Sequence, residues 1–219
     1  PTSWVVREND SMRKPTAYPD YPHPDAKMVR LYPSGNGNEI GNLLLQSSET
    51  SQQTLVDDHN SKGSELASSK SSDNRLLFAT APLNEPLHIS GTAKINIKLS
   101  ADRPAANLSV WVVSLPWKNR TRKINDNIIT RGWADPQNYQ SMTESKPLEP
   151  GKFYDLNFTL QPDDQIIPAG QQIGLMIFSS DHDFTLWPEP GTELTVSLSD
   201  TYLELPMVGG KDAVDTSLK

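Results

Sequence analysis

The feature that most constrains the fold of this chain is the run from Pro147 to Ser180, which contains two stretches of alternating apolar and polar residues. The apolar positions are Tyr154, Leu156, Phe158 and Leu160 in the first stretch, and Ile173, Leu175 and Ile177 in the second. Successive side chains of a β-strand point to opposite faces, so this period of two predicts strands with one buried face. Proline and glycine breaks precede both stretches. The run therefore predicts an antiparallel β-sandwich.

The rest of the chain repeats this pattern at a spacing of about 8–12 residues, which is typical of sandwiches and barrels. Further strands are expected at 27–32, 75–80, 89–99, 107–115, 128–133, 193–198 and 202–206. The segment 107–115 is apolar throughout, so we expect a central strand covered on both faces. The segment 118–127 is expected to form a charged loop. Long connections favour a jelly roll over a meander, and we expect no helix.

The domain organisation follows from composition. We expect a single β-sandwich domain over 1–208, with an extended, proline-rich arm over 1–33 whose tyrosines pack down. The stretch at about 47–72 is rich in serine and predicts a flexible loop, which a short strand near Gln53–Val56 could interrupt. Residues 209–219 are polar and predict a flexible tail. The sequence begins without Met or a signal peptide, which we interpret as a fragment boundary.

Charge and composition exclude several classes of function. The net charge of -7 argues against nucleic acid as a partner, because neutralising phosphates requires clustered Lys and Arg. The chain has no cysteine, which excludes disulfides, thiolate metal sites and cysteine nucleophiles. No apolar run approaches the roughly 20 residues of a membrane-spanning helix, so we expect no membrane partner.

No catalytic motif is present. The sequence lacks Gly-x-Ser-x-Gly, the phosphate-binding loop motif and His-Glu-x-x-His, and its four histidines are scattered. We therefore expect no catalytic residue, metal or cofactor. The segment Ser179–Asp183 has the densest cluster of potentially catalytic or cation-binding side chains, and it could form a general base or a cation site. A polar turn whose side chains cap backbone groups is favoured instead. Asp57–His59 and Asp163–Asp164 are interpreted as solvated loops.

The tryptophans allow two interpretations. Aromatic faces stack on sugars, so Trp117, Trp133 and Trp187, at strand ends or in loops, could bind carbohydrate. Packing at a core or a domain interface is favoured for all three. Trp111 lies inside an apolar strand and is expected in the core or on a sheet face.

Several short sequence segments resemble those of a known family. They are RLLFAT from Arg75, ISGTAKINIKLS from Ile89, LEPG from Leu148, LQPDDQIIPAGQQI from Leu160 and IFSSD from Ile177. Together they resemble the C-terminal domain of bacterial Xaa-Pro dipeptidyl-peptidases, which are serine peptidases, and of their α-amino-acid ester hydrolase and cocaine esterase relatives. The resemblance implies an all-β jelly-roll antiparallel β-sandwich (galactose-binding-domain-like) packed on an α/β-hydrolase catalytic domain that carries the Ser, Asp and His.

The resemblance thus predicts a non-catalytic domain that packs on and stabilises the catalytic domain of an enzyme releasing Xaa-Pro dipeptides from peptide N-termini. We expect docking through the loops 133–139 and 181–187, with Trp133, Tyr139, His182 and Trp187 as candidate contacts. The alternative is a free-standing carbohydrate-binding or surface adhesion module. The expected location is cytoplasmic, with the bacterial cell surface or secretion as the alternative.

Overall fold

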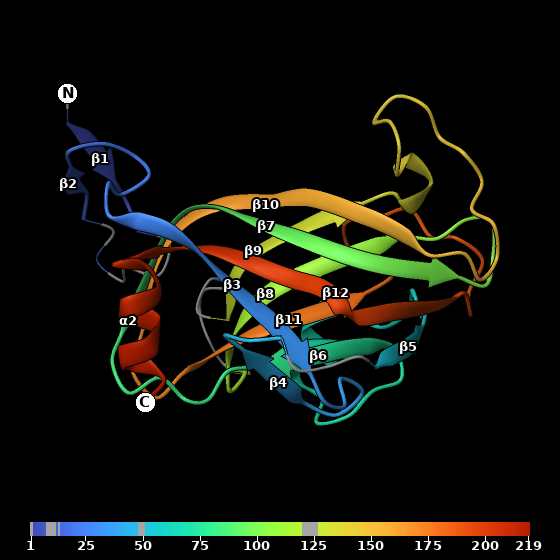
Figure 1. The fold of residues 1–219 in the computed structure, drawn as a ribbon, viewed down its shortest axis with the longest axis horizontal. Helices are drawn as coiled ribbons and strands as arrows, with labels where there is room; N and C mark the ends of the chain where they lie inside the picture. The colour runs from blue at the N-terminus through green and yellow to red at the C-terminus, as the bar shows by residue number, and fades with distance from the viewer. Residues whose placement is uncertain (1, 8–11, 13, 48–50, 120–126) are drawn as a thin grey trace.

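The computed structural model describes residues 2–7, 12, 14–47, 51–119 and 127–219, and strands dominate it (Figure 1). The strands are β1 Ser3–Val5, β2 Thr16–Tyr18, β3 Ala26–Ser34, β4 Gly41–Leu44, β5 Gln52–Val56, β6 Arg75–Ala79, β7 Leu87–Ala101, β8 Leu108–Leu115, β9 Ile128–Ala134, β10 Tyr154–Ile167, β11 Gln172–Phe178 and β12 Glu193–Val208. The helices are α1 Gly63–Ser68, α2 Gly210–Ser217 and the 3-10 helix η2 Pro136–Asn138. The all-β prediction is confirmed.

The main strands form two layers joined by β3. They are hydrogen-bonded in the order β10-β7-β12-β3-β4-β6-β11-β8-β9, and β5 pairs with β12. The first part of β3 pairs with β12 and its last residues pair with β4, so this strand passes from one layer to the other. At the opposite side β9 approaches β10, where Thr130 Oγ1 donates to the Gln161 carbonyl over 2.6 Å. The result is a jelly-roll-like sandwich that is nearly closed.

The main core lies between the layers and follows the period-two pattern. On β7 the buried positions include Ala93, Ile95, Ile97 and Leu99, while Lys94 on the same strand is exposed. The alternate residues of β10 and β11 face the same core. Burial of these side chains at about 25 cal/mol per Å² is the main favourable contribution to folding. The strand faces predicted from the sequence are confirmed.

A second apolar cluster covers the outer face of the layer that contains β8. Leu66 and Ala67 of α1 pack there against Trp111, Met176 and Phe178. Every residue of β8 is buried, as expected for a strand covered on both faces. The approach of α1 is close, because a Cβ at Gly63 would lie 2.4 Å from Cη2 of Trp111.

The serine-rich stretch is more structured than the sequence predicts. The expected strand is β5, but α1 was not expected. Arg75, with 0% exposure, holds this region by donating to the backbone carbonyls of Gly37, Glu39, Leu66 and Ser69. The flexible-loop interpretation is therefore wrong for 51–72, because tertiary contacts order a polar segment. Residues 48–50, and residues 120–126 of the expected charged loop, lie outside the described residues.

The two chain ends also differ from the expectation. The proline-rich arm is shorter than predicted. It ends before Ala26, where β3 begins as part of the main sheet, and not at residue 33. The tail is not flexible: Val214 of α2 is 1% exposed and belongs to the main core. Backbone and side-chain hydrogen bonds join Ser217 to Asn84 and Glu85. The tail prediction is wrong because a short helix with a single strongly buried apolar side chain leaves almost no sequence pattern.

Candidate functional site

The loop that joins β11 to β12 is held by a buried carboxylate. Asp181 is 1% exposed, and its Oδ2 accepts hydrogen bonds from the indole Nε1 of Trp111 and of Trp133, each over 2.9 Å. The backbone carbonyl of Asp181 also accepts from the N–H groups of Phe184 and Thr185. These contacts are those of a turn-forming residue, so the capping interpretation of this segment fits better than a general base or a cation site.

A second buried carboxylate supports the same loop. Asp57, just after β5, accepts hydrogen bonds from the backbone N–H of Ser180 over 2.8 Å and from its hydroxyl over 3.1 Å. Asp57 is buried, so the solvated-loop interpretation is wrong at this position. Charged groups are costly to bury without partners, and here the partner lies more than a hundred residues away in the sequence.

These anchors present an exposed aromatic surface at one end of the sandwich. Leu186 is 91% exposed, Trp187 is 53% exposed and Phe184 is 52% exposed. The Trp187 ring stacks with His59 at a centroid distance of 4.9 Å and with His182 at 5.1 Å. We call Phe184, Leu186, Trp187 and the two histidines the aromatic loop surface. Exposed apolar groups that are held in place are characteristic of interaction sites.

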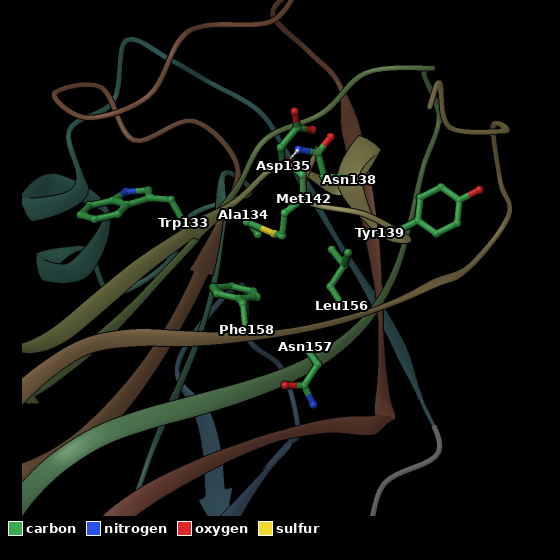
Figure 2. A pocket seen from close by; sticks show the side chains of 9 residues that line it. All are labelled: Trp133, Ala134, Asp135, Asn138, Tyr139, Met142, Leu156, Asn157 and Phe158. Atoms are coloured by element: carbon green, nitrogen blue, oxygen red, sulfur yellow. Dashed lines mark hydrogen bonds between the residues drawn. The ribbon is translucent and has the colours of Figure 1, made fainter. Parts of the chain in front are cut away.

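Trp133 links the aromatic loop surface to a pocket. Its ring stacks on Phe184 at 5.3 Å, and the guanidinium of Arg131 lies 4.2 Å from the centre of the Phe184 ring. On the other side, Trp133 lines a pocket of about 180 Å³ between the ends of β9 and β10 (Figure 2). Tyr139 lines the same pocket and packs against Tyr154 at 4.4 Å.

Two of the four residues proposed from the sequence thus border the pocket, and the other two, His182 and Trp187, belong to the aromatic loop surface. Phe184 and Leu186 lie in the loop 181–187 that was predicted to dock but were not named as contacts, although apolar residues between Asp183 and Pro188 were a usable signal. Arg131 had no such signal, because it is on β9 and its position over Phe184 depends on tertiary structure.

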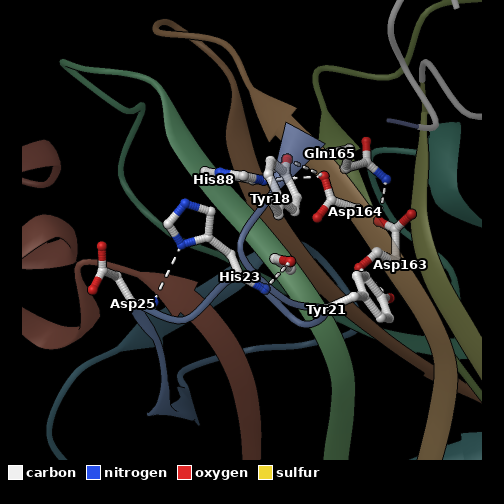
Figure 3. A network of polar contacts seen from close by, with 9 residues as sticks. Tyr18, Tyr21, His23, Asp25, His88, Asp163, Asp164 and Gln165 are labelled. Atoms are coloured by element: carbon white, nitrogen blue, oxygen red, sulfur yellow. Dashed lines mark hydrogen bonds and ion pairs between the residues drawn. The ribbon is translucent and has the colours of Figure 1, made fainter. Parts of the chain in front are cut away.

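A separate polar network fixes the proline-rich arm to β7 and β10 (Figure 3). The Tyr18 hydroxyl donates to Asp164 Oδ1 over 3.0 Å, and His88 Nε2 lies 3.1 Å from the same oxygen. Burial acts to raise the pKa of Asp164, but hydrogen bonds from His88 and Ser90, the electrostatic attraction of His88 and the hydrogen bond from Tyr18 together outweigh it and lower this pKa overall. Burial and the Asp164 charge raise the pKa of Tyr18 to about 12. We interpret the network as a structural attachment of the arm.

This network corrects another sequence-based interpretation. Asp163 and Asp164 are buried on β10 and do not form a solvated loop. Asp163 accepts a hydrogen bond from Gln165, and Tyr21 donates to its backbone carbonyl. Packing of the arm over this end of the sheet excludes water from residues whose type alone predicts exposure.

No group of three or more His, Asp or Glu side chains among the described residues is arranged to hold a metal ion. No helix in the same part of the chain has the length and apolar character needed to cross a bilayer.

Comparisons with known proteins connect this chain to one family. Residues 1–216 match the model of the X-Pro dipeptidyl-peptidase C-terminal non-catalytic domain. A Rhodopirellula baltica protein named "Putative Xaa-Pro dipeptidyl-peptidase" is 57% identical over 95% of this chain and 34% of its own length. A Bacillus anthracis protein of the same name is 36% identical over 92% of this chain and 32% of its own length. The chain thus spans about a third of the length of these relatives.

Solved structures show a similar fold. An aminopeptidase from a marine sediment archaeon, Thaumarchaeota archaeon, superimposes with a TM-score of 0.71 at 17% identity, covering 92% of this chain and 40% of its own. An α-amino acid ester hydrolase superimposes with a TM-score of 0.62 at 16% identity, covering 82% of this chain and 36% of its own. At such low identity these likenesses concern the fold alone.

Proposed function

Because this chain belongs to the X-Pro dipeptidyl-peptidase C-terminal non-catalytic domain family, we propose that it packs on and stabilises the catalytic part of a longer Xaa-Pro dipeptidyl-peptidase. In this proposal the strands and α2 act as a single domain. The Ser, His and Asp that release Xaa-Pro dipeptides by acyl-enzyme chemistry lie on an α/β-hydrolase part outside this chain. We propose a cytoplasmic location for this enzyme, with the bacterial cell surface or secretion as the alternative.

The observation that carries the docking role is the aromatic loop surface. A leucine side chain that is 91% exposed next to half-exposed Trp187 and Phe184 gains free energy when a partner covers it. Interface hot spots are enriched in tryptophan, and anchors that are ordered before binding lose less conformational entropy. The Asp181 and Asp57 hydrogen bonds supply that order. His182, Trp187 and Trp133 are therefore proposed as docking residues, with Tyr139 at the edge.

Nothing in the arrangement favours the carbohydrate-binding alternative. A sugar-binding platform needs exposed, open aromatic faces. Phe184 stacks on Trp133, and both His59 and His182 stack on Trp187. We therefore do not carry carbohydrate forward as a ligand.

The assignment of the chemistry is tested with a chromogenic Ala-Pro substrate. We expect no hydrolysis by the 219-residue chain alone, and hydrolysis by the full-length polypeptide. Full-length enzyme with its nucleophilic serine replaced is the control for contaminating peptidases. Hydrolysis by the chain alone would refute the non-catalytic assignment. Absence of hydrolysis by the folded full-length enzyme would refute the proposed activity.

A further inference from the structure

The side chain of Arg131 lies beside the aromatic loop surface and is enclosed by aromatic rings. Arg131 on β9 is paired with Trp111 on β8, and Trp133 follows two residues later, so the three side chains share the outer face of this layer. The Cζ atom of Arg131 lies 4.2 Å from the centre of the Phe184 ring. The centres of the Trp133 and Trp111 rings are 5.5 Å and 5.7 Å away. These cation–π contacts hold the guanidinium in one place.

This guanidinium has no anionic partner among the described residues. None of their carboxylates lies within 4 Å of it, and it forms no hydrogen bond with them. Asp181 accepts hydrogen bonds from two of the surrounding tryptophans but is not in ion-pair contact with Arg131. Elsewhere in the sandwich, Arg30 and Arg103 each pair with a glutamate, and Arg75 donates to backbone carbonyls. Arg131 is therefore a fixed cation that still lacks an acceptor.

The accessible edge of the guanidinium has the geometry of a carboxylate-binding fork. Nη1 is fully enclosed by the protein, whereas Arg131 as a whole is partly exposed. Nε and Nη2 are neither enclosed nor hydrogen-bonded within the described part of the chain, and they lie on the same edge of the planar group. Two parallel N–H groups on one edge match the two oxygens of a carboxylate. This edge therefore suits an Asp or Glu side chain.

Covering the aromatic loop surface would make such a carboxylate necessary. Phe184 belongs to that surface and lies directly against Arg131. A partner that packs on Phe184 removes water from the guanidinium, and a charge that loses water without gaining an anion is strongly destabilising. Arginine and tryptophan are also enriched together among interface hot spots. The chain spans about a third of the length of its relatives, so the remainder of such a polypeptide is large enough to supply the partner.

We propose that Arg131 is the charged anchor of the docking surface and that it binds the carboxylate of one Asp or Glu side chain in the remainder of a full-length polypeptide. The Nε–Nη2 edge takes the two carboxylate oxygens, while Phe184 and Leu186 pack beside the ion pair. This inference rests on the docking role proposed above and adds the chemistry of the partner surface.

The test is zero-length cross-linking of the full-length polypeptide that carries Arg131→Lys. A water-soluble carbodiimide joins an amine to a carboxylate with which it is in ion-pair contact, and mass spectrometry of the digest identifies the joined residues. We expect the amine at position 131 to be joined to one Asp or Glu outside the 219 residues. Arg103→Lys is the matched control, because its partner Glu189 lies in the same chain and should be the residue joined.

Two results of the cross-linking would overturn the proposal. The first is a cross-link from position 131 to an acidic residue within the 219 residues, such as Asp181. The second is no cross-link from position 131 in a sample series where the Arg103→Lys control is joined to Glu189.

Hydrogen exchange of the loop 181–187 separates this inference from the docking role itself. In the native sequence we expect this loop to exchange at least about thirtyfold more slowly in the full-length polypeptide than in the 219-residue chain. Arg131→Met should speed its exchange at least about thirtyfold in the full-length polypeptide, as for loss of one partner of a buried charge pair. In the 219-residue chain only cation–π contacts are lost, so we expect about fivefold or less.

The two failures are distinguishable by this measurement. Equal exchange of the loop in the native full-length polypeptide and in the native 219-residue chain would refute the docking role. A loop that is protected in the full-length polypeptide, but that responds equally to Arg131→Met in both contexts, would refute the role of Arg131 alone. Arg30→Met, which removes an arginine paired with Glu204, is the control and should leave the exchange of this loop unchanged in both.

Discussion

At the residue scale, this domain is defined by buried polar side chains that hold loops and segments in place. Arg75, Asp181 and Asp164 are all buried, and each forms hydrogen bonds with groups distant in the sequence. Such groups stabilise a structure only while all their partners are present, because a buried charge without partners is strongly destabilising. The segment Ser179–Asp183, which had the composition of a general base or a cation site, therefore has a positioning role.

The substitution Arg75→Met tests the most deeply buried of these three side chains. Burial lowers the pKa of Arg75 to about 10, so the guanidinium is still charged at neutral pH. Its removal takes a charged donor away from four backbone carbonyls, including those of buried Gly37 and Leu66, and we expect the free energy of unfolding to fall by about 3 kcal/mol. Denaturant unfolding measures this. The control is Arg103→Met, at a more exposed site paired with Glu189, where about 0.5 kcal/mol is expected. Equal losses in the two variants would contradict this role for Arg75.

Tyr18→Phe tests the attachment of the arm through pH. The pKa of Tyr18 is raised to about 12 in the folded chain and is about 10 in an unfolded one. The Tyr18 contribution to stability is therefore complete below about pH 10 and is lost between about pH 10 and 12, as the unfolded chain ionises first. We expect the unfolding free energy of the native chain to fall more steeply than that of Tyr18→Phe over this range.

Asp164→Asn is the matched control for that experiment. It removes the charge that helps raise the pKa of Tyr18, so the alkaline loss should be smaller than in the native chain. Superimposable pH curves for the native chain and Tyr18→Phe would show that Tyr18 ionisation does not contribute.

At the scale of elements, long strands were predictable and short helices were not. In β7 the alternation extends over many residues, so its buried face can be assigned from the sequence. By contrast, α1 has six residues and α2 has eight. Segments this short are not stable helices on their own. They exist because α1 covers Trp111 and α2 places Val214 in the core, and these are tertiary contacts.

Val214→Ala tests whether α2 is an integral element. Removing two buried methyl groups should lower the unfolding free energy by about 2 kcal/mol. Val6→Ala, at an exposed position, makes the same chemical change and should cost no more than about 0.5 kcal/mol. Urea unfolding followed by tryptophan fluorescence compares the two. A loss at position 214 as small as that at position 6 would restore the expectation of a flexible tail.

At the scale of the whole molecule, the two ends of the sandwich differ. The N-terminal arm and α2 lie at one end, and the loops after β9 and β11 lie at the other (Figure 1). The proposed docking residues thus gather at the end of the sandwich away from β1, β2 and α2. In a longer polypeptide the remainder would have to reach this end to cover the aromatic loop surface.

Leu186→Ser tests that arrangement in two contexts. In the 219-residue chain the exposed side chain contributes little, so we expect a change within about 0.5 kcal/mol. In the full-length polypeptide, burial of this leucine should make the substitution cost about 1.5–3 kcal/mol. Met28→Ser, at an exposed position near the start of β3, is the control and should be nearly neutral in both. A neutral effect of Leu186→Ser in the full-length polypeptide would exclude Leu186 from the interface.

The sequence by itself determined the strands, their buried faces and the family resemblance, because period-two alternation and short phrases are local properties of the chain. It also placed Trp133 at the end of a strand, and Tyr139, His182 and Trp187 in loops. Only the tertiary structure decided that Asp181 joins two tryptophans, that Arg75 orders a serine-rich segment and that Asn138 lines a pocket. These contacts join residues far apart in sequence or depend on how segments pass over one another. The free energy that fixes them comes from burial, which a linear pattern does not record.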